Sequence, residues 1–346
     1  MTITAPEVSV ARESPQVTPE LWEFVTDTGL QSLVSATSKD PNAKVTVLLV
    51  SPETGQPVLA VKAPTTAAAE RAVDAEARVL KELGRMRLGT VAETIPRVVE
   101  VVEFEQRRAP VMSALPGRPL STAYAERGHT RDSARVSADF RAAGDWLAEL
   151  QQATAGRPAP LDLDAGVSVR LRERFAHDQA LESDLTRLEA MHARLRRSST
   201  PRTVVHGDFW VGNILGSNGR VSGVVDWEAA TVCGEPVRDL VRFANMYALY
   251  LDRGVRRGRA VPGHLGLRAG AWGAGVEYAM YGAGWFPSLY RRFLEDGLVR
   301  LGADRERWHD AALAGIAEVA ALTDHEKFAR LHLELFRRLS SPEVPE

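Results

Sequence analysis

The stretch that decides the fold reads H-G-D-F-W-V-G-N-I-L at residues 206–215, and G-V-V-D-W-E follows at residues 223–228. These two pieces place Asp208, Asn213 and Asp226 on two short loops that a single hairpin would bring together. Carboxylates and amides bind metal ions through oxygen, and carboxylates also accept protons. Because Gly-Asp is a frequent turn pair as well, the prediction rests on the spacing of all three residues.

The spacing is typical of phosphoryl transfer. In protein kinases the catalytic loop reads H-R-D-L-x-x-x-N, and Asp208 and Asn213 keep its five-residue step, with Gly207 in place of the arginine. In this chemistry one carboxylate orients the attacking hydroxyl and accepts its proton, while an amide and a second carboxylate hold Mg²⁺. We therefore predict that Asp208 is the catalytic base and that Asn213 and Asp226 are metal ligands.

A third motif, G-E-P-V-R-D-L at residues 234–240, completes the pattern. Together the three motifs resemble the aminoglycoside phosphotransferase and choline kinase-like family, the small-molecule branch of the kinase fold. The resemblance implies transfer of the γ-phosphoryl group of ATP or GTP to a hydroxyl of a small molecule, such as a sugar, an aminoglycoside-like antibiotic or another metabolite. It also implies that His206 and Asp239 support the catalytic loop, although Asp239 equally suits the first turn of a helix after Pro236.

The pattern before residue 121 predicts a sheet with one helix. Apolar and β-branched residues mark the strands, and a 3–4 periodicity marks a helix at about residues 66–87. The expected strands lie at residues 30–36, 44–51, 57–63, 97–104 and 109–115.

Strands first and helices later in one chain predict an α+β fold, and the resemblance makes it protein-kinase-like with two lobes. We expect a flexible arm at residues 1–20 and a small N-lobe, with an antiparallel sheet plus a helix, at residues 21–116. The P-G-R-P sequence at residues 116–119 marks the boundary. A larger, mostly helical C-lobe would then occupy residues 117–346.

Lys62 and Glu76 are the candidate phosphate-binding pair. Lys62 ends V-L-A-V-K, which resembles the kinase strand whose lysine binds the α- and β-phosphates and pairs with a helix glutamate. Glu76 shares a helix face with apolar residues, where a carboxylate is costly without a cation. Glu70 and Glu82 are rivals with less apolar neighbours.

Other site residues are marked more weakly. The purine is expected against the backbone of the segment from Met112 to Leu115. The loop T-S-K-D-P-N at residues 37–42 would cover the phosphates, although it contains no glycine. Trp210 and Glu228, which adjoin Asp208-Phe209 and Asp226-Trp227, are candidates for binding the acceptor.

Composition excludes several partners. A net charge of −2 argues against a general nucleic-acid binder. Residues 269–286 are rich in Ala, Gly and aromatics, but Glu277 in their middle favours a buried helix over a membrane span. The polar N-terminus lacks the pattern of a signal peptide, and the single Cys233 permits no internal disulfide. We predict a cytoplasmic protein without nucleic-acid or membrane partners, and the oligomeric state stays open.

Two other functions compete with a small-molecule kinase. The segment between Asp226 and Asp239 is too short for a protein-kinase activation segment, and no A-P-E motif follows Asp226. A catalytically silent pseudokinase or nucleotide-binding regulatory module is disfavoured because Lys62, Asp208 and Asn213 are all present with Asp226.

Overall fold

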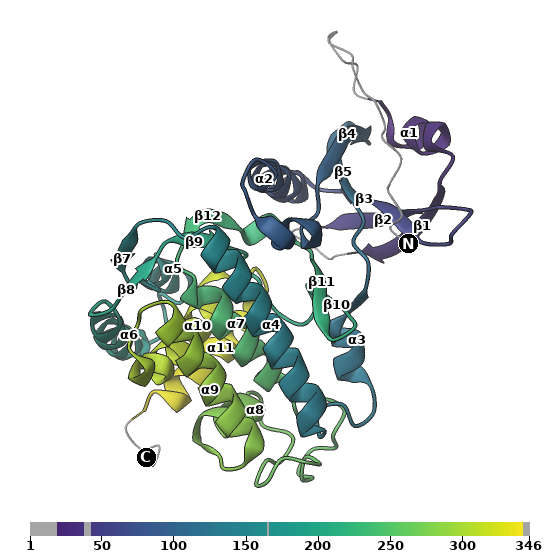
Figure 1. Ribbon diagram of the computed structural model, residues 1–346. Helices are drawn as coiled ribbons and strands as arrows, with labels where there is room; N and C mark the ends of the chain where they lie inside the picture. Colours follow the sequence, from purple (N-terminus) through teal and green to yellow (C-terminus); the bar gives the residue numbers. More distant parts are fainter. Residues whose placement is uncertain (1–18, 38–42, 165, 342–346) are drawn as a thin grey trace. The chain divides into compact units, whose positions relative to one another are not determined.

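The computed structural model describes residues 19–37, 43–164 and 166–341 (Figure 1). These residues form two compact units. The first contains the chain up to Val73 together with Val98–Met112, and the second contains Asp74–Arg97 and the chain from Ser113 onward. Residues 1–18 of the predicted arm lie outside the described residues, and the division of the lobes after residue 116 stays a prediction.

A five-stranded sheet in the order β1-β2-β3-β5-β4 organises the first unit. The pairs β1–β2, β2–β3 and β4–β5 are antiparallel. Helix α1 (Leu21–Thr28), which we did not predict, begins after Glu20, whose carboxylate accepts a hydrogen bond from the Trp22 backbone N–H. The strands are β1 (Gln31–Thr37), β2 (Lys44–Val50), β3 (Pro57–Pro64), β4 (Val98–Phe104) and β5 (Arg107–Ser113).

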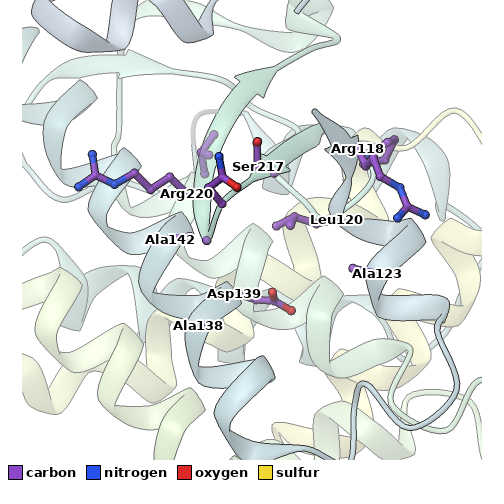
Figure 2. Close-up of a pocket in the computed structure, with 13 residues that line it drawn as sticks. Arg118, Leu120, Ala123, Ala138, Asp139, Ala142, Ser217 and Arg220 are labelled. Carbon is purple, nitrogen blue, oxygen red and sulfur yellow. The ribbon is translucent and has the colours of Figure 1, made fainter. Parts of the chain in front are cut away.

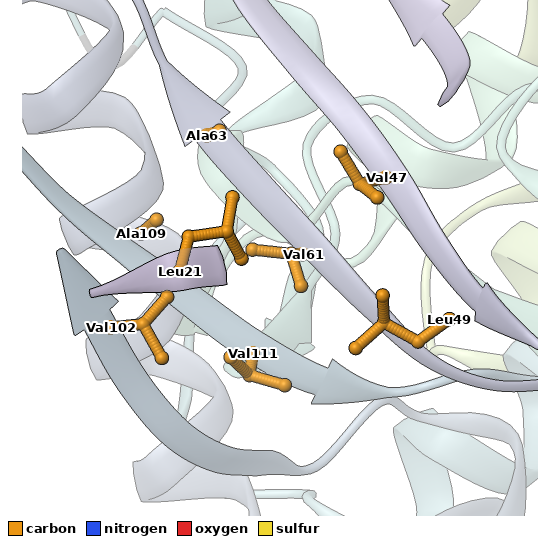
Figure 3. Close-up of a cluster of buried hydrophobic side chains, with 8 residues drawn as sticks. All are labelled: Leu21, Val47, Leu49, Val61, Ala63, Val102, Ala109 and Val111. Atoms are coloured by element: carbon orange, nitrogen blue, oxygen red, sulfur yellow. The ribbon is translucent and has the colours of Figure 1, made fainter. Parts of the chain in front are cut away.

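Alternate residues of these strands, together with one residue of α1, form the core of the first unit (Figure 3). Side chains of a strand alternate between its two faces, so Lys62, between the core residues Val61 and Ala63, points away from this core. Lys62 is nevertheless buried, with 6% of its surface exposed. The core cluster consists of Leu21, Val47, Leu49, Val61, Ala63, Val102, Ala109 and Val111.

The helix predicted at residues 66–87 is α2 (Ala67–Leu83), which begins in the first unit and ends in the second. Its predicted apolar face is real, because Val73, Leu80 and Leu83 are all buried. Glu76 lies among them and is completely buried. The buried carboxylate of Glu76 therefore needs a polar partner, which the candidate active site provides.

Helices make up most of the second unit (Figure 1). At its centre α7 (Val237–Leu249) packs against α4, α8, α9 and α10, and Phe140 of α4 meets the rings of Phe243 and Tyr247 edge-on. The other helices of the second unit are α3 (Leu120–Ala125), α4 (Ser133–Ala153), α5 (Val167–Arg174), α6 (Leu181–Leu195), α8 (Ala274–Tyr281), α9 (Trp285–Arg300), α10 (Trp308–Leu322) and α11 (Glu326–Leu339), with 3-10 turns η1 (Gly89–Thr94) and η3 (Arg305–Arg307).

Short strands frame the segment that carries the motifs. Strand β10 (Ile214–Ser217) pairs with β11 (Arg220–Val224), and Asn218-Gly219 joins them with both residues at positive φ. This is the preferred chemistry of a tight two-residue hairpin turn. The other short strands are β6 (Arg118–Pro119), β7 (Pro158–Pro160), β8 (Ser199–Pro201), β9 (Thr203–Val205) and β12 (Thr231–Gly234).

The antiparallel sheet of the first unit and the helical second unit confirm the predicted α+β class. Residues 269–286, where we expected a buried helix, contain only the eight-residue α8 and the start of α9. In the described ranges, no helix has the length and apolar character needed to cross a membrane.

Candidate active site

The hairpin β10–β11 brings Asn213 next to Asp226. Asn213 immediately precedes β10, and its backbone carbonyl accepts a hydrogen bond of 2.9 Å from the N–H of Val225. Asp226 follows Val225 directly. The two predicted metal ligands therefore emerge from adjacent strand ends.

Asp226 has a strained backbone that its neighbours stabilise. Its φ of 64° and ψ of 62° are left-handed, which costs a non-glycine residue roughly 1–2 kcal/mol. The next residue, Trp227, opens the 3-10 turn η2 (Trp227–Ala229), and its N–H donates to the buried carboxylate of Glu76 at 3.0 Å. Its indole N–H donates to the Val224 carbonyl at 2.8 Å. Glu76 thus supports the residue that follows Asp226, a contact we did not predict.

His206 links the catalytic loop to the Asp226 strand. Its Nδ1 accepts a hydrogen bond from the Asp208 backbone N–H at 3.2 Å, so the proton lies on Nε2, which donates to the Val225 carbonyl at 2.9 Å. The imidazole is completely buried. Both ring nitrogens are used within this region, which fits a supporting role better than acid–base chemistry.

Asp239 anchors the start of the same loop. Its carboxylate accepts hydrogen bonds from the backbone N–H groups of His206 at 2.7 Å and Gly207 at 2.9 Å. Burial raises the pKa of Asp239, and His206 and the two N–H groups partly oppose that rise. Asp239 also lies in the first turn of α7. The two alternatives for this residue, loop support and a helix first turn, are therefore compatible.

The Asn213 amide orients the Asp208 carboxylate. Its Nδ2 donates to both the backbone carbonyl and the Oδ2 of Asp208, each at 3.0 Å. Because both acceptors face the nitrogen, the Asn213 Oδ1 atom is turned elsewhere and suits a hard cation such as Mg²⁺. Among the described residues, no three His, Cys, Asp or Glu side chains form a complete metal site. Mg²⁺ would therefore take further ligands from phosphates and water.

Arg242 is a site residue that the sequence analysis missed. Its guanidinium forms an ion pair with Asp208, with Nε at 3.0 Å and Nη2 at 2.5 Å from Oδ1. A signal was present in the sequence, because Arg238 and Arg242 are the only cations in α7 and stand one turn apart. In the structure, every other residue from Val237 to Leu249 is buried.

A cavity of about 380 Å³ adjoins Asp208 within the second unit. Its walls are strongly charged, and the Arg238–Glu318 ion pair lies in them. Burial raises the pKa of Glu318, which Arg238 opposes. The lining residues are Gly207, Asp208, Glu228, Ala229, Arg238, Val241, Arg242, Gly315, Glu318, Val319, Leu322, Thr323, Asp324 and His325.

The two predicted acceptor residues differ in position. Glu228 lines this cavity, whereas Trp210 is absent from its walls. The Trp210 ring lies 6.2 Å from that of Tyr250 and covers Gly212 so closely that a Cβ there would collide with it.

A second cavity, of about 270 Å³, is a poorer candidate (Figure 2). Asp139 projects into it from α4. Its carboxylate is already bound at 2.7 Å by both the His129 Nε2 and the Tyr247 hydroxyl. None of the predicted site residues lines this cavity.

The predicted nucleotide residues fall in both units. Lys62 and Met112 belong to the first unit and are buried, while Glu76 and Leu115 belong to the second. The Lys62–Glu76 pair and the purine contact stay predictions. Residues 38–42 of the predicted phosphate-covering loop lie outside the described residues.

Comparison with known proteins decides the family. The sequence model of the phosphotransferase enzyme family (APH) matches residues 43–272, which is most of the chain. The protein belongs to this family. Members of the phosphotransferase enzyme family transfer phosphate to hydroxyl groups of small molecules, so this family member is a small-molecule phosphotransferase. The family resemblance and the enzyme class predicted from the sequence are confirmed.

Solved structures agree on the fold of this phosphotransferase. A thermostable mutant of the aminoglycoside phosphotransferase APH(4)-Ia matches with a TM-score of 0.55 and 12% identity, over 92% of this chain and 97% of that chain. The macrolide 2'-phosphotransferase MphH from Brachybacterium faecium matches with a TM-score of 0.51 and 15% identity, over 94% and 98%. At such identities the likeness shows the kinase-like fold alone. No curated protein sequence matches the chain.

Proposed function

We propose that this phosphotransferase moves the γ-phosphoryl group of ATP, or of GTP, to a hydroxyl of a small molecule with Asp208 as the base. The observation that carries the proposal is the hydrogen-bonded segment 206–213. In it, His206 and Asn213 tie Asp208 to the strand end that bears Asp226. Such pre-organisation suits phosphoryl transfer, which depends mainly on positioning and charge stabilisation.

In the proposed step, the acceptor oxygen attacks the γ-phosphorus and its proton passes to Asp208. The new O–P bond forms while the bond from the γ-phosphorus to the bridging oxygen breaks, and the nucleoside diphosphate leaves. Asn213, through Oδ1, and Asp226 would hold Mg²⁺, which when bound neutralises charge on the phosphates. His206 and Asp239 would keep the loop in place.

The nucleotide roles rest on the family resemblance. Lys62, paired with Glu76, is proposed to bind the α- and β-phosphates, and the backbone from Met112 to Leu115 to bind the purine. APH(4)-Ia has been solved with AMP-PNP and hygromycin B, which supports ATP as the phosphoryl donor. Competition of ATP and GTP in one assay would measure the preference.

The charged cavity beside Asp208 is proposed as the acceptor site. Its size and charged walls suit a polar, hydroxylated molecule, and Glu228 would contribute to binding. Sugars and sugar-containing antibiotics are the class to test first, given the hygromycin B and macrolide relatives.

The test is a ³¹P and mass-spectrometric screen of hydroxylated metabolites and antibiotics with the Mg complexes of ATP and GTP. Asp208→Asn should lower transfer by roughly 10²–10⁴-fold while calorimetry still detects nucleotide binding. Asp304→Asn, at the cap of η3 and outside the site, is the matched control. Wild-type turnover in Asp208→Asn would overturn the base assignment. Nucleotide binding without transfer or hydrolysis by the wild type would favour the regulatory alternative.

A further inference from the structure

The contact between Arg242 and Asp208 is asymmetric. Two donors of Arg242, Nε and Nη2, reach the same oxygen of Asp208, Oδ1, at 3.0 and 2.5 Å. The other oxygen, Oδ2, accepts one side-chain hydrogen bond, from Asn213 Nδ2 at 3.0 Å. The Arg242 side chain is 22% exposed and that of Asp208 33%, so solvent only partly screens the pair.

This asymmetry distinguishes the two oxygens of the proposed base. A carboxylate oxygen has two lone pairs, so the two donors of Arg242 fill Oδ1. Asn213 occupies one lone pair of Oδ2 and leaves the other able to accept a hydrogen bond from a hydroxyl. The χ2 torsion of aspartate is broad, so a carboxylate held at one oxygen alone could turn. The planar fork of an arginine on a buried helix opposes that rotation.

The nearby carboxylate of Glu318 is already paired with Arg238, so Arg242 pairs with Asp208. The other arginine of α7, Arg238, lies one turn away and is bound to Glu318. Glu318 is itself largely buried, so its carboxylate is neutralised by Arg238 rather than by solvent. The two ion pairs therefore lie side by side in the wall of one cavity.

We propose that Arg242 is a positioning residue that holds Oδ1 of Asp208 and so presents Oδ2 to the acceptor hydroxyl. Oδ2 then takes the proton as the acceptor oxygen bonds to the γ-phosphorus and the nucleoside diphosphate leaves. Loose transition states of phosphoryl transfer depend on alignment more than on proton abstraction, so a cation beside the base is compatible with catalysis. The inference rests on the proposed function, because it requires Asp208 to be the base.

The experiment compares Arg242→Met, Arg242→Lys and Arg194→Met in the full-length enzyme. Arg194 forms an ion pair with both oxygens of Asp310, at 2.9 and 2.6 Å, so its substitution removes an arginine–aspartate pair outside the site. Magnesium-ATP hydrolysis, in which water takes the place of the acceptor, supplies the assay, together with any acceptor found in the screen.

We expect Arg242→Met to lower kcat by on the order of 10²-fold, as a misplaced catalytic group does, with the KM for Mg-ATP unchanged. Arg242→Lys should recover part of the loss, and Arg194→Met should keep wild-type kcat. Adding Arg242→Met to Asp208→Asn should not lower kcat further, because the base that Arg242 positions is already removed. A crystal structure of Arg242→Met should show the Asp208 carboxylate rotated or in two orientations.

Three results would overturn the proposal. One is an unchanged or higher kcat in Arg242→Met, which would mean that the ion pair does not align the base. A second is an equal loss in Arg194→Met, which would indicate general destabilisation. The third is an unmoved Asp208 carboxylate in the variant structure. If the wild type neither transfers nor hydrolyses, the proposed function fails and this inference with it; turnover equal in wild type and Arg242→Met sinks the inference alone.

Discussion

The backbone at position 207 requires a glycine where protein kinases have arginine, and the cost of replacing that glycine can be measured. Its φ is +82°, so an alanine there bears a left-handed backbone penalty of roughly 1–2 kcal/mol. The added Cβ would also collide with the carbonyl oxygen of Ala229 and lie 3.0 Å from its carbonyl carbon. Because backbone must move, an overpacking cost of about 1–3 kcal/mol adds to the first. The free energy of unfolding of Gly207→Ala should therefore be about 2–5 kcal/mol lower than that of the wild type.

Gly219, in the β10–β11 turn, is the matched control. Its φ is +73°, but a Cβ added there would have no atom within 4 Å, so Gly219→Ala should lose only about 1–2 kcal/mol. Urea unfolding gives both values, provided that the m-value is unchanged. Movement of Ala229 against the loop should also reduce phosphoryl transfer in Gly207→Ala alone. Equal losses of stability in the two variants would refute the steric argument.

Three further predictions concern buried or strained groups. Burial lowers the pKa of His332 to about 3, so between pH 6.5 and 3 the folded state binds fewer protons than the unfolded state and stability falls as the pH falls. By pH 5 the loss of stability amounts to about 2 kcal/mol, and urea unfolding should show a flatter pH profile for His332→Gln than for the wild type. Asp226→Gly keeps a residue that tolerates the left-handed backbone of this position, yet it should weaken Mg-ATP binding by calorimetry; unchanged affinity would contradict the metal role. Asp239→Asn should lower the free energy of unfolding in denaturant by about 2–4 kcal/mol, because the N–H groups of His206 and Gly207 bond to different oxygens of Asp239 and an amide has only one oxygen. A loss below about 1 kcal/mol would argue that Asp239 does not anchor the loop.

The fold was predictable where local pattern and burial agree. Runs of apolar and β-branched residues predicted the five strands of the first unit, and the 3–4 periodicity predicted α2 to within a few residues at each end. Helix α1 was not predicted, although Leu21, Phe24 and Val25 pack on the core at helical spacing. Its eight residues make only about two turns, which is too short for a periodic pattern to stand out.

The motifs of the candidate site were predictable from the sequence, but the contacts that Glu76 and Arg242 make with it were not. Asp208 and Asn213 lie five residues apart, so one local turn, closed by the hydrogen bond from the Asn213 N–H to the Trp210 carbonyl, brings their side chains together. The support from Glu76 to Trp227 spans 151 residues, and no local pattern encodes such a pairing. The position of Glu76 on an apolar helix face indicated only that its carboxylate needs a polar partner, and not which one.

By itself, therefore, the sequence determined the family, the α+β class and the residues with suitable chemistry, because these depend on residue types at short, connected spacings. Only the tertiary structure decided that Arg242 grips one oxygen of Asp208, across 34 residues, and that Asp239 holds His206 and Gly207. The physical reason is that packing of α7 against its neighbours sets which way its few polar side chains point. Hydrogen-bond geometry over 2.5–3.0 Å then selects the partners, and neither quantity is present in the linear order of residues.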